Sequence, residues 1–178
     1  MSKKIIIISS SPRKNGNSDI LCDEFMRGAE AAGHAVEKIR LADSDIRYCT
    51  GCCSCVGNPG SCVQDDDMNE IYPKILDADV MVLASPIYFR SFNAHMKTFM
   101  DRVCPIYPMI NGKDVYYIVA AGGGQFPVDC TIKSFRVFTD CFSNITEKAT
   151  IAATGVWNEN GVKGKAVLKE AFEAGKSC

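Results

Sequence analysis

Cysteine residues gather in one short stretch of this 178-residue chain. Half of its ten cysteines fall within fourteen residues, at Cys49, Cys52, Cys53, Cys55 and Cys62. Four of them have the spacing C-x2-C-x2-C-x6-C, which lets several thiolates converge on one centre without a large fold around them. Thiolate is the soft ligand that holds zinc and iron–sulfur clusters. The stretch is therefore the first place to expect inorganic chemistry.

A second polar segment, residues 9–18 (SSSPRKNGNS), follows the apolar run at residues 5–8 and is called the serine-rich loop. Its donor side chains are those of Ser9, Ser10, Ser11, Asn15, Asn17 and Ser18. The helix start that we expect after it adds free backbone N–H groups. Arg13 supplies a forked cation suited to phosphate, and Gly16 permits a tight turn. A polar turn without a ligand is the alternative, but the donors exceed what a turn requires, so we favour a phosphate site.

The common nucleotide-binding loops are missing from the sequence. It contains no G-x-x-x-x-G-K-[ST], and no G-x-G-x-x-G follows the first expected strand. The glycine trio, Gly122, Gly123 and Gly124, lacks the third spaced glycine. These absences disfavour a kinase, an ATPase and a dinucleotide-fold dehydrogenase.

Composition places the chain among ordinary globular proteins, with 47% hydrophobic and 23% charged residues. A net charge of -1 gives no bulk reason to expect nucleic acid or an anionic membrane as a partner. The apolar run at residues 5–8 is too short for a signal peptide or a membrane span. We therefore expect a cytoplasmic protein, where a cysteine cluster is metal-binding or redox-active rather than a disulfide framework.

The remaining cysteines receive no role from the sequence. Cys22, Cys104, Cys130 and Cys141 are scattered on expected helices or beside apolar residues, where free cysteine packs as a small hydrophobe. Cys178 is the last residue and is expected to be mobile.

Strand and helix patterns alternate along the whole chain. We expect strands at 4–9, 35–41, 79–84, 115–121 and 147–154. We expect helices from Asn17 or Ser18 to Gly33, from a capping box at 67–70, at 92–103, at 128–143 and at 163–175. The acidic residues 65–67 are explained more simply by that capping box than by a metal site. The alternation predicts a parallel sheet with helices on both faces and ligands at the carboxyl ends of its strands. The serine-rich loop, residues 85–89 and the glycine trio should meet there.

Three segments in this order resemble the NADPH-dependent FMN reductase family of flavodoxin-like proteins. They are SPRKNGNS at residues 11–18, ASPIYF at residues 84–89, and Lys97 through Asp101 and Arg102. The cysteine stretch running into Asp66-Asp67-Met68 resembles the iron–sulfur flavoprotein branch of that family.

The resemblance extends from residue 4 to about residue 155 and implies the fold. It implies a flavodoxin-like α/β three-layer sandwich with a five-stranded parallel sheet of order 2-1-3-4-5. We expect residues 1–178 to form a single FMN-binding domain with a cysteine-rich segment at about 48–66, called the cysteine loop.

The resemblance also implies FMN and the residues that hold it. The phosphate candidates are Ser11, Arg13, Asn15, Asn17 and Ser18. Along the isoalloxazine ring it places Pro86, Ile87, Tyr88 and Phe89, with Asn93 nearby and Gly122, Gly123 and Gly124 from the next loop. The residue types agree with these roles, because glycines admit a close backbone and apolar or aromatic side chains match a flat ring. For Tyr88 and Phe89 the simpler alternative is a core plug at a strand end.

Three residues depart from the family pattern. Ser10 stands where glycine is usual, so the serine-rich loop is expected to be slightly reshaped. Arg90 replaces a small residue beside the expected flavin edge, where it either favours an anionic substrate or is a solvated rim residue. Cys53 is an extra thiol that is expected to point away from the metal centre.

For the cysteines, the resemblance implies a [4Fe–4S] cluster on Cys49, Cys52, Cys55 and Cys62. Structural zinc more often uses two C-x2-C pairs, so the third close cysteine argues against it. A loop that holds no metal and shapes the flavin pocket or a subunit contact is the remaining alternative. The sequence leaves all three open.

The leading functional hypothesis is an FMN-dependent oxidoreductase. It would take electrons from reduced nicotinamide, NAD(P)H, or from ferredoxin and pass them to a small acceptor. One rival is an electron carrier with FMN and a cluster but no small substrate, and another is a zinc-binding module on a flavin-free flavodoxin-like fold. By analogy with the family, a homodimer or homotetramer is expected.

Overall fold

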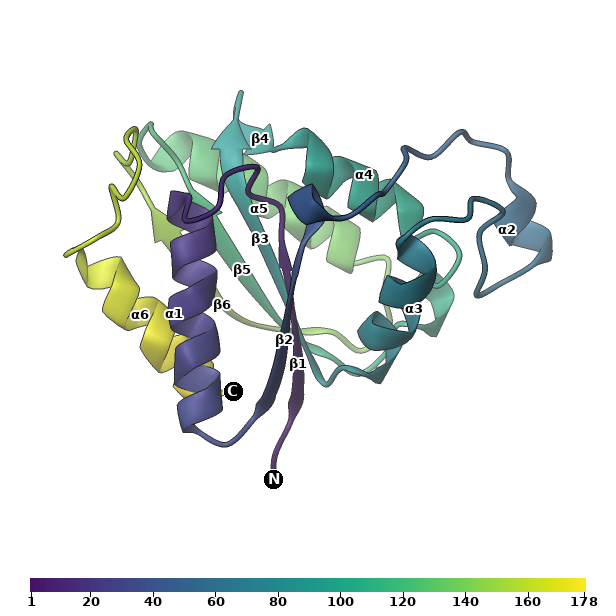
Figure 1. Ribbon diagram of the computed structural model, residues 1–178, viewed down its shortest axis with the longest axis horizontal. Coiled ribbons are helices and arrows are strands. Elements are labelled where there is room, and N and C mark those ends of the chain that lie inside the picture. The colour runs from purple at the N-terminus through teal and green to yellow at the C-terminus, as the bar shows by residue number, and fades with distance from the viewer.

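The apolar run at residues 5–8 forms a central strand, as its β-branched composition predicts. In the computed structural model, which describes residues 1–178, five strands are parallel: β1 (Lys4–Ser9), β2 (Ala35–Arg40), β3 (Val80–Tyr88), β5 (Asp114–Ala120) and β6 (Thr146–Ala153). Their order in the sheet is β2-β1-β3-β5-β6 (Figure 1). The expected order 2-1-3-4-5 is thus confirmed. The chain adds one short strand, β4 (Ser91–Phe92), which pairs antiparallel with the end of β3.

Helices cover both faces of the sheet. They are α1 (Asn17–Ala31), α2 (Ser54–Gly57), α3 (Met68–Asp77), α4 (Ala94–Arg102), α5 (Gln125–Thr139) and α6 (Ala166–Lys176). Two 3-10 turns lie at Leu41–Asp43 and Tyr107–Met109. Figure 1 shows α1 and α6 on one face and α3, α4 and α5 on the other. The chain therefore has the expected three layers, and none of its helices has the length and apolar character to cross a bilayer.

The alternation of side chains along β1 divides the core into two halves. Ile5 and Ile7 pack with α1 and α6, whereas Ile6 and Ile8 pack with α3, α4 and α5. All four are almost completely buried. Because successive side chains of a strand point to opposite faces, an unbroken apolar run requires cover on both sides.

Helices α1 and α6 touch through their backbones. A Cβ added at Gly28 of α1 would lie 2.0 Å from the Phe172 carbonyl oxygen, and one at Gly175 of α6 would lie 2.0 Å from the Phe25 carbonyl oxygen. Only a residue without a side chain fits at either position. The two glycines therefore fix how closely these helices approach.

Several predicted helix boundaries were wrong, and the structure gives the reasons. Asn17 and Ser18 do not cap α1, because both already lie within the helix. The capping position is Gly16, which makes no side-chain cap bond. Helix α3 begins at Met68 with Asp67 at its N-cap, as the capping box at residues 67–70 predicted, but the capping hydrogen bond does not form, since the Asp67 carboxylate accepts from the Asp45 N–H instead. Phe92 lies in β4, and α4 starts later, where the Asn93 side chain accepts from the Met96 N–H at 3.2 Å.

The last two helices also differ from their expected ranges. Helix α5 begins at Gln125, directly after the glycine trio, and ends at Thr139 rather than 143. Helix α6 begins at Ala166 rather than 163, because Gly164 has a left-handed backbone conformation that a helix excludes.

Candidate cofactor site

The serine-rich loop lies at the carboxyl edge of the sheet, between β1 and α1. It lines a cavity of about 210 Å³ together with the ends of β3 and β5 and the segment after β6. The residues around this cofactor cavity are Ser11, Arg13, Gly16, Asn17, Ser18, Pro86, Ile87, Tyr88, Ala120, Gly122, Val156, Trp157 and Glu159. Four separate segments of the chain thus converge, one more than the sequence predicted.

The start of α1 presents hydrogen-bond donors that the protein itself does not use. The backbone N–H groups of Asn17, Ser18 and Asp19 have no acceptor in the chain. The Ser18 hydroxyl is buried, with its residue 1% exposed, and also has no hydrogen-bond partner. Leaving such a group unsatisfied costs about 1–3 kcal/mol. An anion at this helix start would satisfy these groups and be stabilised by the helix dipole.

Gly16 keeps the serine-rich loop tightly folded. A Cβ added there would lie 2.5 Å from Ser11 Oγ and 3.2 Å from the Arg13 carbonyl oxygen. Ser11 Oγ in turn donates to that carbonyl at 2.9 Å. The loop is therefore a preformed concave turn beneath the free N–H groups. Arg13 lies on its rim, 3.7 Å from Glu159 in an ion pair whose side chains are both more than half exposed, at 54% and 69%.

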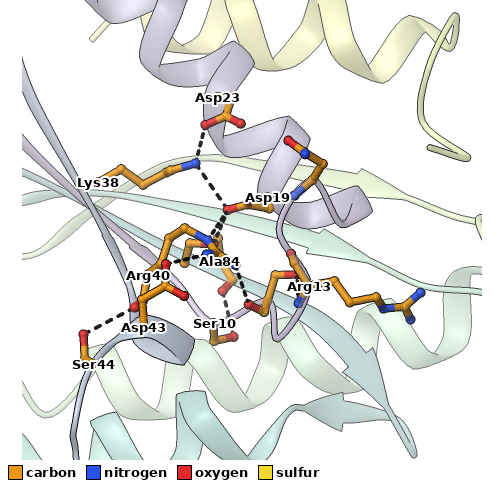
Figure 2. Close-up of polar contacts among 12 residues, drawn as sticks. Ser10, Arg13, Asp19, Asp23, Lys38, Arg40, Asp43, Ser44 and Ala84 are labelled. Carbon is orange, nitrogen blue, oxygen red and sulfur yellow. Dashed lines mark hydrogen bonds and ion pairs between the residues drawn. The ribbon is translucent and has the colours of Figure 1, made fainter. Parts of the chain in front are cut away.

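A buried carboxylate, Asp19 at the start of α1, holds this loop through hydrogen bonds (Figure 2). It accepts from Ser9 Oγ at 2.9 Å and from the Asn15 N–H at 3.1 Å. Two cations of β2 neutralise it, with Lys38 Nζ at 3.3 Å and Arg40 Nε at 3.4 Å. Because Asp19 is 3% exposed, these partners offset the cost of burying its carboxylate. The Asp19 network thus connects the serine-rich loop to the neighbouring strand.

Outside that network, each cation of β2 has a second carboxylate partner. Lys38 pairs with Asp23, and Arg40 with Asp43 at 2.5 Å. Burial lowers the pKa of Lys38, but Asp23 and Asp19 more than offset this effect and leave the pKa raised. Lys38 therefore stays charged beside Asp19.

Three asparagines predicted at the site have other partners in the structure. The Asn17 amide donates to the Val156 and Asn158 carbonyls at 3.0 and 2.9 Å, which ties α1 to the segment after β6. Asn93 is 3% exposed and connects the Ser10 carbonyl to the start of α4. Asn15 has a left-handed backbone and lies outside the cavity lining. Asn17 therefore offers a ligand its N–H, and Asn93 supports the site without lining it.

The end of β3 carries the apolar wall of the cavity. Pro86, Ile87 and Tyr88 line it, and Tyr88 is 41% exposed rather than packed as a core plug. Phe89 and Arg90 then form the two-residue turn of the β3–β4 hairpin, with φ values of 47° and 68°. Left-handed backbone at two residues that are not glycine costs about 1–2 kcal/mol each. Such strain is typical of functional loops.

This strained turn directly follows Tyr88, which lines the cavity. Phe89 is fully exposed, and the Arg90 guanidinium lies 5.1 Å from the centroid of the Phe126 ring. Neither residue lines the cavity itself, and neither do Gly123 and Gly124. Of the predicted ring contacts, the structure brings together Pro86, Ile87, Tyr88 and Gly122.

Sequence reasoning missed Trp157, the single tryptophan of the chain. A Cβ at Gly122 would lie 2.5 Å from the indole Cδ2, so the ring packs directly on the glycine backbone. The Trp157 side chain is nevertheless 78% exposed, which leaves an aromatic surface at the cavity mouth. Its position after the last strand of a parallel sheet was the signal available in the sequence, because loops at that edge carry ligands.

Arg102 and Asp66 close the base of the cysteine loop. Arg102 Nη1 and Nη2 donate to the two Asp66 oxygens at 2.6 and 2.9 Å, and Nη1 also donates to the Arg47 carbonyl at 2.6 Å. Both charged side chains are buried, at 1% and 0% exposed. Burial raises the pKa of Asp66, but hydrogen bonds from Arg102, Arg47 and Met68 outweigh it and hold the pKa below its usual value. The acidic residues 65–67 therefore do more than start α3, which corrects the simpler prediction.

The cysteine loop, with the short helix α2 in it, projects beyond α3 and α4 (Figure 1). The four predicted ligands, Cys49, Cys52, Cys55 and Cys62, line one small cavity of about 30 Å³. Hydrogen bonds from Ser54 lower the pKa of the Cys52 thiol, which favours the thiolate form that metals bind. In this conformation no three Cys, His, Asp or Glu side chains are placed to hold one metal ion. The thiols share a cavity without converging on one point.

Two further cysteines, Cys53 and Cys104, also line this cavity. Cys104 is exposed, as is Cys141, so the prediction that they pack as small hydrophobes was wrong. Cys22 is buried in the core, as predicted.

Comparison with known proteins agrees with this geometry. The model of the NADPH-dependent FMN reductase family matches residues 3–158. An iron-sulfur flavoprotein of Archaeoglobus fulgidus is 40% identical over 122 residues, 67% of this chain and 55% of the relative. One of Methanocaldococcus jannaschii is 40% identical over 103 residues, 58% of this chain and 53% of the relative. The chain thus spans about half the length of these two curated relatives.

Solved structures share the fold at low sequence identity. An NAD(P)H:quinone oxidoreductase from Methanothermobacter marburgensis superposes with a TM-score of 0.77 at 18% identity, covering 99% of this chain and 96% of that one. An FMN-dependent NADH-azoreductase from Bacillus anthracis gives a TM-score of 0.77 at 18% identity, covering 98% of each chain.

Proposed function

Because the chain belongs to the NADPH-dependent FMN reductase family, we propose that it is an oxidoreductase with FMN in the cofactor cavity. One observation carries the proposal: the buried Ser18 hydroxyl and the free N–H groups of Asn17, Ser18 and Asp19 lack acceptors at the cavity floor. A phosphate would supply acceptors for all of them. Ser11 and Arg13 line the same cavity beside them.

The flat ring of FMN would lie against the apolar and aromatic lining of the cavity. Pro86, Ile87 and Tyr88 come from the end of β3, and Gly122 and Trp157 from the segments after β5 and β6. Apolar and aromatic surfaces of this kind match a planar heterocycle. When bound, FMN would accept a hydride from NAD(P)H, or electrons from ferredoxin, and release them to a small acceptor. The residues bind and orient the ring; hydride transfer requires no general base among them.

We further propose that Cys49, Cys52, Cys55 and Cys62 hold a [4Fe–4S] cluster when metal is supplied. Their soft donor chemistry, their common cavity and the lowered pKa of the Cys52 thiol support it. The relatives are named for an iron–sulfur group as well as a flavin. The loop would have to close slightly for the four thiolates to converge.

The visible spectrum of anaerobically purified protein tests both cofactors, with iron, sulfide and zinc assays on the same sample. We expect a flavin spectrum over a broad absorption that dithionite bleaches, with about four irons per chain. Flavin without iron would leave an FMN reductase with an empty cysteine loop. A colourless protein with stoichiometric zinc would remove the oxidoreductase proposal. Rapid reduction by ferredoxin with negligible NAD(P)H oxidation would identify an electron carrier instead.

Gly16→Ala tests the phosphate site directly. Its Cβ would meet Ser11 Oγ at 2.5 Å and open the serine-rich loop, so FMN affinity should fall about tenfold, equivalent to ~1.4 kcal/mol. Quenching of FMN fluorescence on titration with apoprotein measures this change. Gly57→Ala is the matched control, because its Cβ meets nothing within 4 Å and it is far from the cavity. Equal affinities for the two variants would contradict a phosphate in this loop.

We also propose that residues 1–178 act as a single domain that assembles as a homodimer or homotetramer. Aromatic side chains are exposed at Phe89, Phe126 and Trp157, of which Trp157 lines the cofactor cavity, and a second subunit would cover them. Light scattering would remove this proposal if the FMN-bound protein is a monomer. We propose a cytoplasmic protein, because a cysteine cluster of this spacing is more often metal-binding or redox-active than a disulfide framework, and we propose no nucleic-acid or membrane partner.

A further inference from the structure

Cys104 lies against the cysteine loop although it is 42 residues further along the chain than Cys62. Its Sγ is 3.7 Å from Cys55 Sγ, and both residues line the same small cavity. Among the hydrogen bonds that involve a cysteine sulfur, this is the only one between two sulfur atoms. A sequence pattern based on spacing within the loop has no means of finding this pair.

The backbone around Cys104 is anchored by buried neighbours. Cys104 follows the end of α4, and its neighbours Val103 and Ile106 are buried in the core at 1% and 0% exposed. By contrast, Cys49, Cys52 and Cys53 are all exposed on the loop. Cys104 is therefore flanked by residues that belong to the core, and Cys62 of the same cavity also packs against it.

Two connections keep the loop beside Cys104. The Gly60 N–H donates to the Pro105 carbonyl at 2.8 Å, directly next to Cys104 in the chain. The Arg102 side chain ties the two ends of the loop together through Arg47 and Asp66. Because these contacts lie on both sides of Cys55 in the sequence, they limit how far its sulfur can move away from Cys104.

We propose that Cys55 and Cys104 form a redox-active pair of thiols that a small disulfide of the glutathione type oxidises to an intrachain disulfide. One cysteine thiolate attacks a sulfur of the small disulfide, forms a mixed disulfide and releases one small thiol. The second cysteine thiolate then displaces the other small thiol and closes the Cys55–Cys104 bond. The protein loses two electrons and two protons, and the small disulfide gains both as two thiols.

The disulfide would have a consequence for metal binding, and this part rests on the proposed cluster. Cys55 is one of the four proposed ligands, and a sulfur bonded to Cys104 no longer offers a thiolate. Oxidation would therefore remove one ligand of the cluster, and reduction would restore it. Cys104 would thus determine the conditions under which the loop accepts iron.

Peptide mapping of the metal-free protein tests the pair without any metal. Trypsin cleaves after Arg47, Lys74, Arg102 and Lys113, so the loop cysteines lie in peptide 48–74 and Cys104 lies in peptide 103–113. After treatment with glutathione disulfide and alkylation of free thiols, mass spectrometry without reduction should find these two peptides joined. Addition of dithiothreitol should separate them.

Three variants locate the bond. The joined peptides should persist in Cys53→Ser, the matched loop control, and be lost in Cys55→Ser and Cys104→Ser. Alkylated Cys104 beside disulfides confined to peptide 48–74 would overturn the proposal. So would a joined product of equal yield in Cys55→Ser.

A second measurement tests the consequence for the loop. Oxidised wild-type protein is incubated with iron and sulfide, and bound iron is assayed with and without dithiothreitol. We expect dithiothreitol to raise the iron bound by the wild type more than that bound by Cys104→Ser; equal responses would overturn the link to metal binding. If no variant binds iron under either condition, the cluster proposal fails, while the peptide map still decides whether the pair exists.

Discussion

Arg102→Ala will lower the free energy of unfolding by about 3–5 kcal/mol, because it leaves the buried Asp66 carboxylate without its cation. It also removes the bond to the Arg47 carbonyl, so both ends of the cysteine loop lose their attachment. Urea denaturation measures the stability, and the same protein should bind less iron than the wild type. The loss of both properties together would show that the ion pair organises the loop.

Arg136→Ala is the matched control for that prediction. Arg136 makes a similar two-bond contact with Glu147 at 2.7 Å, but the side chains are 55% and 32% exposed. Exposed pairs of this kind contribute about 0–1 kcal/mol. An equal loss of stability in both variants would mean that the buried Arg102–Asp66 pair stabilises the fold no more than an exposed pair does.

The pH dependence gives an independent test of the same pair. The pKa of Asp66 is held below its usual value in the folded wild type. Ionised Asp66 therefore stabilises the fold at pH values above its pKa in the unfolded chain, and this stabilisation is lost as the pH falls through its pKa in the folded protein. In Arg102→Ala, burial dominates and raises the pKa of Asp66, so protonation favours the folded state as pH falls. The difference in unfolding free energy between wild type and variant should therefore narrow from pH 7 towards pH 4. A constant difference would contradict this account.

Asp19→Ala will weaken FMN binding by about tenfold to a hundredfold, or ~1.4–2.8 kcal/mol. The substitution removes the acceptor for Ser9 and for the Asn15 N–H, and it leaves Lys38 and Arg40 beside an empty position. The serine-rich loop then lacks these hydrogen bonds in the free protein, so part of the FMN binding energy is used to order the loop. Titration of apoprotein with FMN, followed by fluorescence, measures the effect.

Two variants distinguish the effect of Asp19 on the order of the serine-rich loop from the effect of its negative charge on FMN affinity. Asp23→Ala removes the other partner of Lys38 but makes no contact with the serine-rich loop, so it should bind FMN like the wild type. Asp19→Asn retains a hydrogen-bond acceptor while removing the negative charge, so it should lose less affinity than Asp19→Ala. Tighter binding by Asp19→Asn than by the wild type would show that repulsion between Asp19 and the phosphate outweighs its ordering role.

The sequence was sufficient for the parts of the structure that depend on local pattern. The apolar run at residues 5–8 required cover on both faces of a sheet, and α1 and α3 supply part of it. The serine-rich loop had its donors at a helix start, and the structure places them there. Each of these features depends on residues that are neighbours in the chain.

The parts that the sequence did not predict depend on contacts across the fold. Cys104 reaches the cysteine loop because α4 ends beside it, and Trp157 reaches the cavity because it packs on Gly122. The Asn17 and Asn93 amides had the right chemistry for a ligand, but backbone carbonyls of distant segments take their hydrogen bonds. The sequence identifies a hydrogen-bond donor, but it does not identify the protein acceptor that takes its hydrogen bond in place of a ligand.

The contacts of Gly28 with Phe172, and of Gly175 with Phe25, make α6 part of the packed fold. The match to the family model stops at residue 158, before α6 begins at Ala166. Yet the α6 backbone packs directly on Gly28 of α1, and the other end of α1 carries the proposed phosphate site. A fragment cut at residue 158 would leave that backbone contact of α1 uncovered. The smallest fragment of this fold for use in protein engineering therefore includes the C-terminal helix α6.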